Sequence, residues 1–414
     1  MTKKQKWLSR KFLIYKLLTN LWFVGAVWLY FYRIYITDGQ VGILDGVAFA
    51  IGLVAEVPSG VLADKFGRDK MVRLGQFLAG SGLIVQAFGT GLTQFMAGQA
   101  IMMIGVSFVS GADEALFFEQ LKFKQSSVDW RKLVTRGAQI ALIGTTSATI
   151  IGGLLHNLDP RIPWIVTGLS FISSVALIWP IKDTRPTKDR QAMWPELREQ
   201  LLSIKLGFAE FLTKKLALYI PIIIIVQGLF YAAGWGLLRL VLLDRFHFSP
   251  FAGSIVIASS SLITVAMLHL MYKYAERMSE KRVLTSISIL AGISLLASVF
   301  DIGMWGYLVI LSLYAGEHVL QPFMSEVLNY RTEEDQRATV LSVSSFLRTL
   351  PYVALAPIIG SLNDQNTLHY FLIVWTALIV VAVLVYLSLK KKDKIISLSG
   401  EDEIEPRVPE MATK

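Results

Sequence analysis

Ionisable side chains lie deep inside long apolar stretches of this chain. Glu317 and His318 are near the middle of the apolar stretch 304–328, and Arg348 is at a comparable depth in the stretch 339–361. A carboxylate that faces an arginine stays ionised, whereas a carboxylate released into an apolar pocket takes up a proton. We therefore expect Glu317 to carry a coupling proton whose affinity is set by His318 or Arg348. The alternative is a fixed structural ion pair between Glu317 and Arg348.

Further carboxylates lie within apolar stretches at Glu56, Asp113 and Glu114. An ionisable group at membrane depth costs about 2.5–3.5 kcal/mol on insertion scales, so it normally faces the interior of a helix bundle. These groups are nearer the cytoplasmic end of their stretches, where all three are proton-coupling candidates that could titrate in a cavity open to the cytoplasm. Asp113 or Glu114 is expected to assist Glu317. The alternatives are local pairing of Glu56 beside Pro58 and exposure of Glu114 in a cytoplasmic vestibule.

Two charges lie near the outer ends of the first two apolar stretches. Arg33 is close to the end of 13–35, and Asp45 is close to the start of 41–62. Asp45 also shares one helix face with Glu56, because their separation is close to a whole number of helical turns. The positions predict an extracellular gate formed by Arg33 and Asp45.

Polar and aromatic side chains near these charges are candidates for binding a small molecule. Gln321 follows Glu317 by one helical turn, and the adjacent Pro322 is expected to bend its helix. An aromatic surface for a hydrophobic or cationic ligand could be formed by Trp28, Tyr231 and Trp235. The alternative is that these aromatic residues face lipid. No second histidine or carboxylate cluster accompanies His318, so a metal site is not expected.

The composition places most of the chain in lipid. Of 414 residues, 54% are hydrophobic and 17% charged, and the mean hydropathy is +0.53, whereas soluble proteins are about one-quarter charged. Cysteine is absent, which excludes a disulfide framework. Since a membrane-spanning helix needs about 20 apolar residues, the apolar runs predict spans at 13–35, 41–62, 71–90, 96–121, 137–156, 162–181, 216–242, 251–272, 283–300, 304–328, 339–361 and 367–389.

The basic residues are distributed unevenly over the loops between these spans. Most of the 40 Lys and Arg residues lie at the two ends and in the loops of one side, whereas the loop 89–98 on the other side has none. Positive charge marks the cytoplasmic side. We therefore expect a protein of the cell membrane of a bacterium-like cell, with both termini on the cytoplasmic side. The net charge of +9 is thus a topology signal, and neither nucleic acid nor an obligate protein partner is expected.

The polar interval 182–215 divides the spans into two weakly similar halves, 1–181 and 216–389, and the tail 390–414 is expected to be disordered. The predicted fold class is an all-α polytopic membrane protein with 12 transmembrane helices in two pseudo-symmetric six-helix halves. The interval itself predicts an amphipathic helix at the cytoplasmic membrane surface, with a plain linker as the alternative. Its apolar face consists of Trp194, Leu197, Leu201, Ile204, Phe208 and Phe211.

The most specific motif follows the second span. It reads Gly60-Val61-Leu62-Ala63-Asp64-Lys65-Phe66-Gly67-Arg68-Asp69-Lys70. A degenerate copy, Tyr274 to Arg282, occupies the corresponding loop of the second half. The motif resembles the signature of the major facilitator superfamily, and the resemblance in topology covers roughly residues 10 to 390. It implies the fold of that superfamily.

The signature loop has a physical interpretation of its own. Gly67 permits a tight turn, and the Asp64 carboxylate can stabilise the positive end of a neighbouring helix. The resemblance implies that Gly60, Asp64, Gly67 and Arg68 belong to a conformational latch, with Asp64 facing the eleventh helix. By pseudo-symmetry Glu276 would act in the same way against the fifth span. The alternative is that these are only cytoplasmic topology charges.

Shorter stretches resemble efflux-type members of the superfamily. They include the entry to the eleventh span, Arg337 to Ser342, and for this reason Arg337 is included in the predicted latch. Two features depart from drug/proton antiporters, which commonly have an Arg in the fourth span and a Gly-Pro kink in the fifth. Here no Arg lies between Met96 and Leu121, and Ser147 to Gly153 keeps only the paired glycines.

The resemblance implies a secondary active transporter that moves a small molecule across the cytoplasmic membrane by alternating access. We expect proton-coupled export of hydrophobic or amphipathic compounds, as in multidrug efflux, with the proton gradient as the energy source and no cofactor. The alternatives are proton-coupled uptake of a small organic solute and a membrane sensor that transports nothing. An enzyme is not expected, because the chain has no Walker-type loop and no clustered His/Asp site.

Overall fold

The computed structural model describes residues 3–122, 130–183, 193–275, 279–334 and 336–397. This part of the chain consists of helices and connecting loops, with no strand. It divides into two compact units. The first unit comprises Met1–Leu201 and Phe248–Ala258, and the second comprises Leu202–His247 and Ser259–Lys414.

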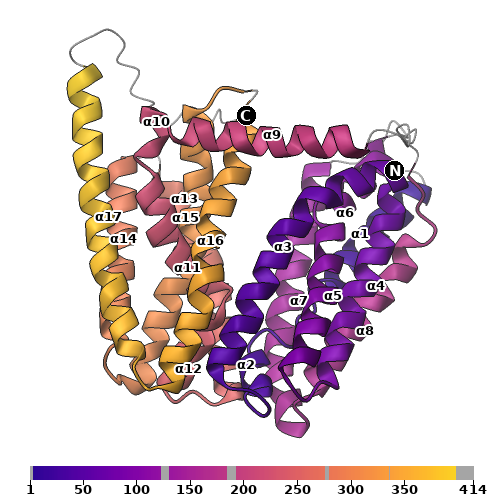
Figure 1. Cartoon of the computed structure of the whole chain (residues 1–414). Helices are drawn as coiled ribbons and strands as arrows, with labels where there is room; N and C mark the ends of the chain where they lie inside the picture. The colour runs from indigo at the N-terminus through magenta and orange to yellow at the C-terminus, as the bar shows by residue number, and fades with distance from the viewer. Residues whose placement is uncertain (1–2, 123–129, 184–192, 276–278, 335, 398–414) are drawn as a thin grey trace. The chain divides into compact units, whose positions relative to one another are not determined.

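The first unit contains the helices of the predicted spans one to six. In Figure 1 they run from indigo to magenta: α1 (Lys3–Leu18), α2 (Trp28–Tyr32), α3 (Asp38–Phe66), α4 (Arg68–Ala87), α5 (Leu92–Val109), α6 (Ala112–Lys122), α7 (Trp130–Leu158) and α8 (Ile162–Ile178). α4 packs against α5 and α8, and α3 packs against α5. An apolar cluster that includes Phe12, Tyr15 and Phe117 joins α1 to α6.

Glycines let α4 approach its neighbours closely. A Cβ atom at Gly82 would lie 2.5 Å from the carbonyl oxygen of Gly98 in α5, and one at Gly80 would lie 2.5 Å from the carbonyl oxygen of Gly168 in α8. Small residues at helix crossings allow dense backbone packing in membrane proteins, where dispersion contacts replace the hydrophobic effect. The glycines therefore determine how α4 packs in this unit.

Two spans of the first unit are interrupted, which the apolar runs did not predict. Turns at residues 19–27 separate α1 from α2, and Ser110 and Gly111 separate α5 from α6. Gly111 has φ +71°, a left-handed conformation that favours glycine. Hydropathy alone does not show a break, because an interrupted span is as apolar as a continuous one.

The second unit contains the helices of spans seven to twelve, apart from Phe248–Ala258, which belongs to the first unit. They are α10 (Lys214–Ala217), the π-helical segment η1 (Ile222–Gln227), α11 (Gly228–Gly234), α12 (Leu237–Arg245), α13 (Pro250–Ala275), α14 (Glu280–Ala297), the short 3₁₀ segment η2 (Gly303–Trp305), α15 (Gly306–Arg331), α16 (Arg337–Asp364) and α17 (Leu368–Ser397). α11 packs against both α15 and α16. α15 continues through Pro322.

The seventh span bends by 65° between α11 and α12. The bend occurs at Trp235 and Gly236, where a Cβ atom on Gly236 would collide with the ring of Tyr352. The Tyr352 hydroxyl accepts a hydrogen bond of 2.6 Å from the backbone N–H of Leu237. This bond satisfies a donor that the break leaves without a helical partner.

Among the described residues, six helices are long and apolar enough to cross a membrane, or seven if the bent pair Ile222–Gly234 and Leu237–Arg245 is one span. The other predicted spans also coincide with helices, but these are shorter, interrupted or carry more charge. The all-α polytopic fold class is confirmed.

The linker and the tail contain helices as well. α9 (Met193–Phe211) occupies much of the interval 182–215, and its Phe208 packs edge-on against Phe346 of α16, with ring centroids 5.6 Å apart. α17 continues to Ser397, so the prediction of disorder directly after residue 389 is wrong for residues 390–397. Lysine is a good helix former, and no Gly or Pro stops the helix there.

Candidate functional site

A buried ion pair connects α15 and α16 in the second unit. Arg348 Nη1 donates a hydrogen bond of 2.7 Å to Glu317 Oε1, and Glu317 is only 3% exposed. A buried charge without its partner is strongly destabilised. Any movement that separates these two side chains must therefore be accompanied by protonation or re-pairing of Glu317.

The surrounding backbone provides the space that Glu317 occupies. A Cβ atom on Gly234 of α11 would lie 3.0 Å from Glu317 Cγ, and a Cβ atom on Gly316 would collide with the ring of Phe230. Both positions need glycine so that α11 can approach α15. The chain thus uses small residues next to its most deeply buried carboxylate.

Aromatic rings lie against Arg348 and against His318, the residue that follows Glu317. The Arg348 guanidinium lies 5.1 Å from the centre of the Tyr231 ring, a cation–π contact. His318 stacks on Tyr314 with ring centroids 4.4 Å apart, and its Nδ1–H donates a hydrogen bond of 3.0 Å to the Tyr314 carbonyl. The ring centroids of Trp235 and His318 are 6.1 Å apart. The structure therefore brings together predicted proton-coupling and aromatic residues of the second unit.

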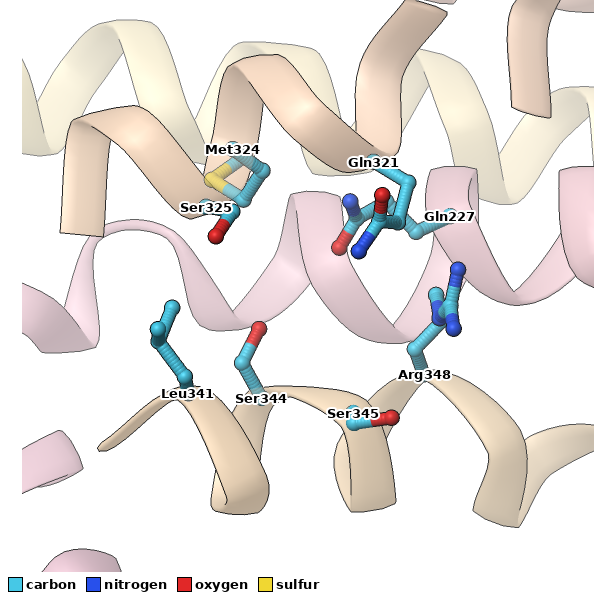
Figure 2. Close-up of a pocket in the computed structure, with 8 residues that line it drawn as sticks. All are labelled: Gln227, Gln321, Met324, Ser325, Leu341, Ser344, Ser345 and Arg348. Carbon is cyan, nitrogen blue, oxygen red and sulfur yellow. The ribbon is translucent and has the colours of Figure 1, made fainter. Parts of the chain in front are cut away.

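A polar cavity of about 60 Å³ adjoins Arg348. Figure 2 shows the amides of Gln227 and Gln321 close together, with Arg348 and Ser344 of α16 pointing toward them. The polar lining consists of Gln227, Gln321, Ser325, Ser344, Ser345 and Arg348. Gln321 was predicted as a ligand-binding residue, whereas Gln227, at the end of η1, was not. Hydrogen-bonding groups thus extend from the ion pair along the ends of α15 and α16 that are predicted to be cytoplasmic.

Comparison with known proteins identifies the family. The model of the Major Facilitator Superfamily matches residues 13–356. The chain belongs to this superfamily. It is also 22% identical over 333 residues to "Multidrug resistance protein 2" of Bacillus subtilis (strain 168), an alignment that covers 78% of this chain and 80% of the relative.

Solved transporters of the superfamily fold share the architecture. A nucleoside transporter is similar with a TM-score of 0.78 and 12% identity, covering 92% of this chain and 99% of that one. A peptide transporter gives 0.71 and 13%, covering 97% and 96%, and a D-xylose-proton symporter gives 0.63 and 13%, covering 92% and 96%. At these identities the likeness shows the fold. Together with the family match, it shows that the chain is a membrane transporter and not an enzyme.

The superfamily signature joins α3 to α4 at the buried Gly67, whose φ of +96° ends one helix and begins the next. The following Arg68 binds two carboxylates: its Nη1 donates to Glu119 of α6 at 2.5 Å, and its backbone N–H donates to Asp183 at 2.9 Å. Asp64 is half-buried, and Gly60 is exposed. Within the first unit, Arg68 therefore ties together the ends of α4, α6 and the segment after α8.

The corresponding loop of the second unit centres on a carboxylate. Glu280, which precedes the predicted span 283–300, accepts hydrogen bonds from Tyr219 at 2.8 Å, Tyr386 at 2.8 Å, Lys390 at 2.7 Å and Arg331 at 2.9 Å. Burial alone would raise the pKa of Glu280, but the hydrogen bond from Lys390 and the charge of Arg331 outweigh it and lower the pKa to about 2. The predicted latch residue Glu276 lies outside the described residues.

The two loop clusters have opposite charge. Arg68 and Glu280 are related by the same offset along the chain that relates Asp64 to Glu276, and each begins a helix, α4 or α14. Arg68 binds two carboxylates, whereas Glu280 binds an arginine and a lysine. The two halves thus keep a charged residue at the start of the helix with partners of opposite charge, but the charge of this residue is positive in one half and negative in the other. The sequence comparison of the loops had not revealed this, because the partners lie on other helices.

A second charged cluster lies in the first unit where the fourth span is interrupted. Lys16 Nζ at the end of α1 contacts Glu114 at 2.8 Å and Asp113 at 3.3 Å in the first turn of α6. The lysine was not predicted as a partner. Glu56 is exposed and does not belong to this cluster, although the Ser59 hydroxyl donates to its backbone carbonyl at 2.7 Å.

The remaining predicted residues have local partners. Arg33 forms a bidentate ion pair with Asp38 at 2.7 Å, while Asp45 is buried in α3. Trp28 packs edge-on against Tyr32. Arg337 donates to the carbonyls of Asn329 and Thr332 at 3.1 and 3.3 Å, and so caps the end of α15 from the start of α16.

Proposed function

We propose that this chain is a proton-coupled secondary transporter of the cell membrane that exports amphipathic small molecules, with Glu317 as the proton carrier and the proton gradient as its energy source. The observation that carries the proposal is the buried Glu317–Arg348 ion pair beside a polar cavity. Both partners belong to one unit, so relative movement of α15 and α16 is sufficient to make or break the pair.

The chemical argument concerns the carboxylate when Arg348 withdraws. An ionised carboxylate alone in an apolar site is unfavourable, so Glu317 would take up a proton. When Arg348 returns, the ion pair re-forms and the proton leaves. If the conformational change of transport separates and rejoins Glu317 and Arg348, it can proceed only with uptake and release of the proton. Proton movement is then coupled to transport.

The proposal for export is supported by the similarity to the multidrug resistance protein of Bacillus subtilis (strain 168). The Tyr231 ring beside Arg348 and the Trp235 ring beside His318 favour a ligand with an apolar part. The polar cavity next to them favours a ligand with a hydrogen-bonding part. An amphipathic compound satisfies both.

Other charged groups have supporting roles in this proposal. Lys16 with Asp113 and Glu114 would assist proton transfer in the first unit, and the Arg68 and Glu280 clusters would hold each unit's loop end rigid as the latch. Arg33 with Asp38 would stabilise the outer end of α3, next to the predicted gate residue Asp45.

The test is a flux assay in proteoliposomes with a panel of hydrophobic, amphipathic and polar solutes, each measured with and without an imposed pH gradient. The proposal expects gradient-driven movement of amphipathic members of the panel. The direction of movement relative to the proton gradient distinguishes export from uptake. A chain that moves its solute equally well without any gradient would contradict proton coupling, and a chain that moves no solute would favour a membrane sensor.

A further inference from the structure

A buried amide in the second unit lacks a hydrogen-bond donor. Gln227 is 2% exposed, and its Nε2 makes a long hydrogen bond of 3.4 Å to the carbonyl of Leu320. None of the residues that the structure describes donates a hydrogen bond to its Oε1. Leaving a buried acceptor without a donor is energetically unfavourable. A donor supplied from outside the chain would remove this cost.

The amide lines the polar cavity next to Arg348. Figure 2 shows the amide of Gln227 beside that of Gln321, with the side chains of Ser344 and Arg348 on the opposite side. The volume of about 60 Å³ exceeds the roughly 10–15 Å³ that one water needs. It is well below the roughly 300–1,000 Å³ of a complete drug site. The cavity therefore has the size for one functional group of a larger molecule.

Irregular backbone positions this amide. Gln227 is the last residue of the π-helical segment η1, and Trp375 Nε1 donates to the carbonyl of Ile225 within the same segment at 3.1 Å. π-helical turns are rare and occur frequently at functional sites. An α-helix through this segment would give Gln227 a different direction. The π-helical segment is a second indication that the position of the Gln227 amide is important for function.

The charges around the cavity limit what can enter. A cationic group would be repelled by Arg348, and an anionic group would compete with Glu317 for the same guanidinium. Gln227 Oε1 requires a donor, while Gln321 and the serines can both donate and accept. A neutral group that donates and accepts hydrogen bonds satisfies all of these conditions.

We propose that this cavity is a subsite for the neutral polar end of the transported molecule, a carboxamide or a hydroxyl group that donates to Gln227 Oε1 and accepts from Gln321 or a serine hydroxyl. The inference rests on the proposed transport function, because the transported molecule is what would reach the cavity. It adds a substrate class to that function: amphipathic compounds whose polar end is uncharged.

The absence of cysteine allows a direct test on the full-length protein in detergent. In Ser344→Cys the introduced thiol lies in the cavity, and in Ser342→Cys it lies exposed on the same helix, outside the cavity lining. The probes are iodoacetamide, which is neutral and ends in a carboxamide, and iodoacetate, which has nearly the same shape but is anionic. The measured quantity is the alkylation rate with each probe.

The neutral probe should be favoured in the cavity. The ratio of the iodoacetamide rate to the iodoacetate rate is expected to be about tenfold higher at position 344 than at position 342, because entry of the anion disturbs the ion pair. Adding Gln227→Leu should lower the iodoacetamide rate at position 344 by about three- to tenfold, the value of one hydrogen bond. The rate at position 342 should stay unchanged, which also reports that the fold is intact.

Equal ratios at the two positions would overturn the inference, since the cavity would then be only hydrated space without preference. A thiol at position 344 that reacts with neither probe would overturn it as well. If Gln227→Leu does not fold, the ratios measured in Ser344→Cys and Ser342→Cys with Gln227 unchanged still test the inference. None of these results depends on transport, so failure of the subsite is distinguishable from failure of proton coupling.

Discussion

At the scale of single residues, the chain stabilises buried charges by multiple hydrogen bonds, and Glu280 shows how strongly. It accepts bonds from two tyrosines, a lysine and an arginine, and these donors hold its pKa at about 2 against an ordinary value of 4.5. A carboxyl group whose pKa is lowered by folding stabilises the folded state above its ordinary pKa, and this contribution is lost as the pH falls through the lowered value.

The Glu280 contribution should therefore be constant from neutral pH down to about pH 5 and disappear between about pH 4.5 and 2. Its size is about 3 kcal/mol. Thermal melting of the detergent-solubilised protein as a function of pH measures it. Glu280→Gln should have a lower melting temperature than the unmodified protein at pH 7. Its melting temperature should also lack the fall between about pH 4.5 and 2 that Glu280 causes. Glu334→Gln, which changes a highly exposed carboxylate, should melt like the unmodified protein; a similar loss in both variants would contradict the argument.

The sequence predicted much of the main site at this scale, and the reasons are physical. Glu317 and Arg348 stand out because charge within an apolar stretch is expensive, and the structure brings them into contact. Gln227 does not stand out, because a neutral amide in an apolar run has no comparable signal, and the π-helical segment that directs it is not encoded by periodicity. Lys16 was counted as a topology charge, and its carboxylate partners are distant in sequence.

At the scale of elements, interruptions of helices determine where the functional groups lie. The bend of 65° in the seventh span leaves the backbone N–H of Leu237 without a helical acceptor. The Tyr352 hydroxyl accepts a hydrogen bond of 2.6 Å from it. The break of the fourth span likewise presents Asp113 and Glu114 at the start of a new helix, α6. The apolar runs predicted where the helices lie, but they contain no information on such breaks.

Removing the hydroxyl at the bend tests its role. Tyr352→Phe should leave the Leu237 N–H buried without a partner and lower the free energy of unfolding by about 1–3 kcal/mol. Melting temperature in detergent is the measurement. Tyr330→Phe on α15 is the matched control, because Tyr330 is 54% exposed and should tolerate the change. Equal melting of Tyr352→Phe and the unmodified protein would show that the bend does not need this hydrogen bond.

Close packing of α4 on α5 makes a second element-scale prediction. In Gly105→Ala the new Cβ atom would meet the backbone of Gly75 and Ala79 in α4, so the helices must separate at a cost of about 1–3 kcal/mol. Gly91→Ala, at the start of α5, places the same atom in open space with extended backbone and should be neutral. Unfolding of both variants, followed by tryptophan fluorescence, compares them; equal stability would refute the packing argument.

At the scale of the whole molecule, composition and charge predicted a polytopic membrane protein, the signature Gly60 to Lys70 predicted the transporter superfamily, and the family match confirms that superfamily. The orientation in the membrane follows from the loop cations and remains a prediction. Single cysteines in this cysteine-free chain can test it with a membrane-impermeant maleimide. Thr90→Cys should be labelled on intact cells, and Lys70→Cys only after permeabilisation. The reverse pattern would place both termini outside.

The halves also show what a whole-chain sequence comparison can miss. The signature loops predicted a related pair of latches, but the structure gives Arg68 two acidic partners and Glu280 two basic ones. The Arg68 side chain pairs with Glu119 and its backbone N–H with Asp183, whereas the Glu280 carboxylate pairs with both Arg331 and Lys390. Pseudo-symmetry is therefore visible in the positions of the charges and not in their identity.

The central claim is that Glu317 carries the coupling proton, and substrate exchange in proteoliposomes tests it most directly. Glu317→Gln should still exchange labelled for unlabelled solute across the membrane when no gradient is imposed, because a neutral side chain mimics the protonated state. It should fail to accumulate solute when a pH gradient is applied, whereas Glu326→Gln, a matched change at an exposed site on the same helix, should accumulate it normally. Gradient-driven accumulation by Glu317→Gln equal to that of the unmodified protein would contradict the account.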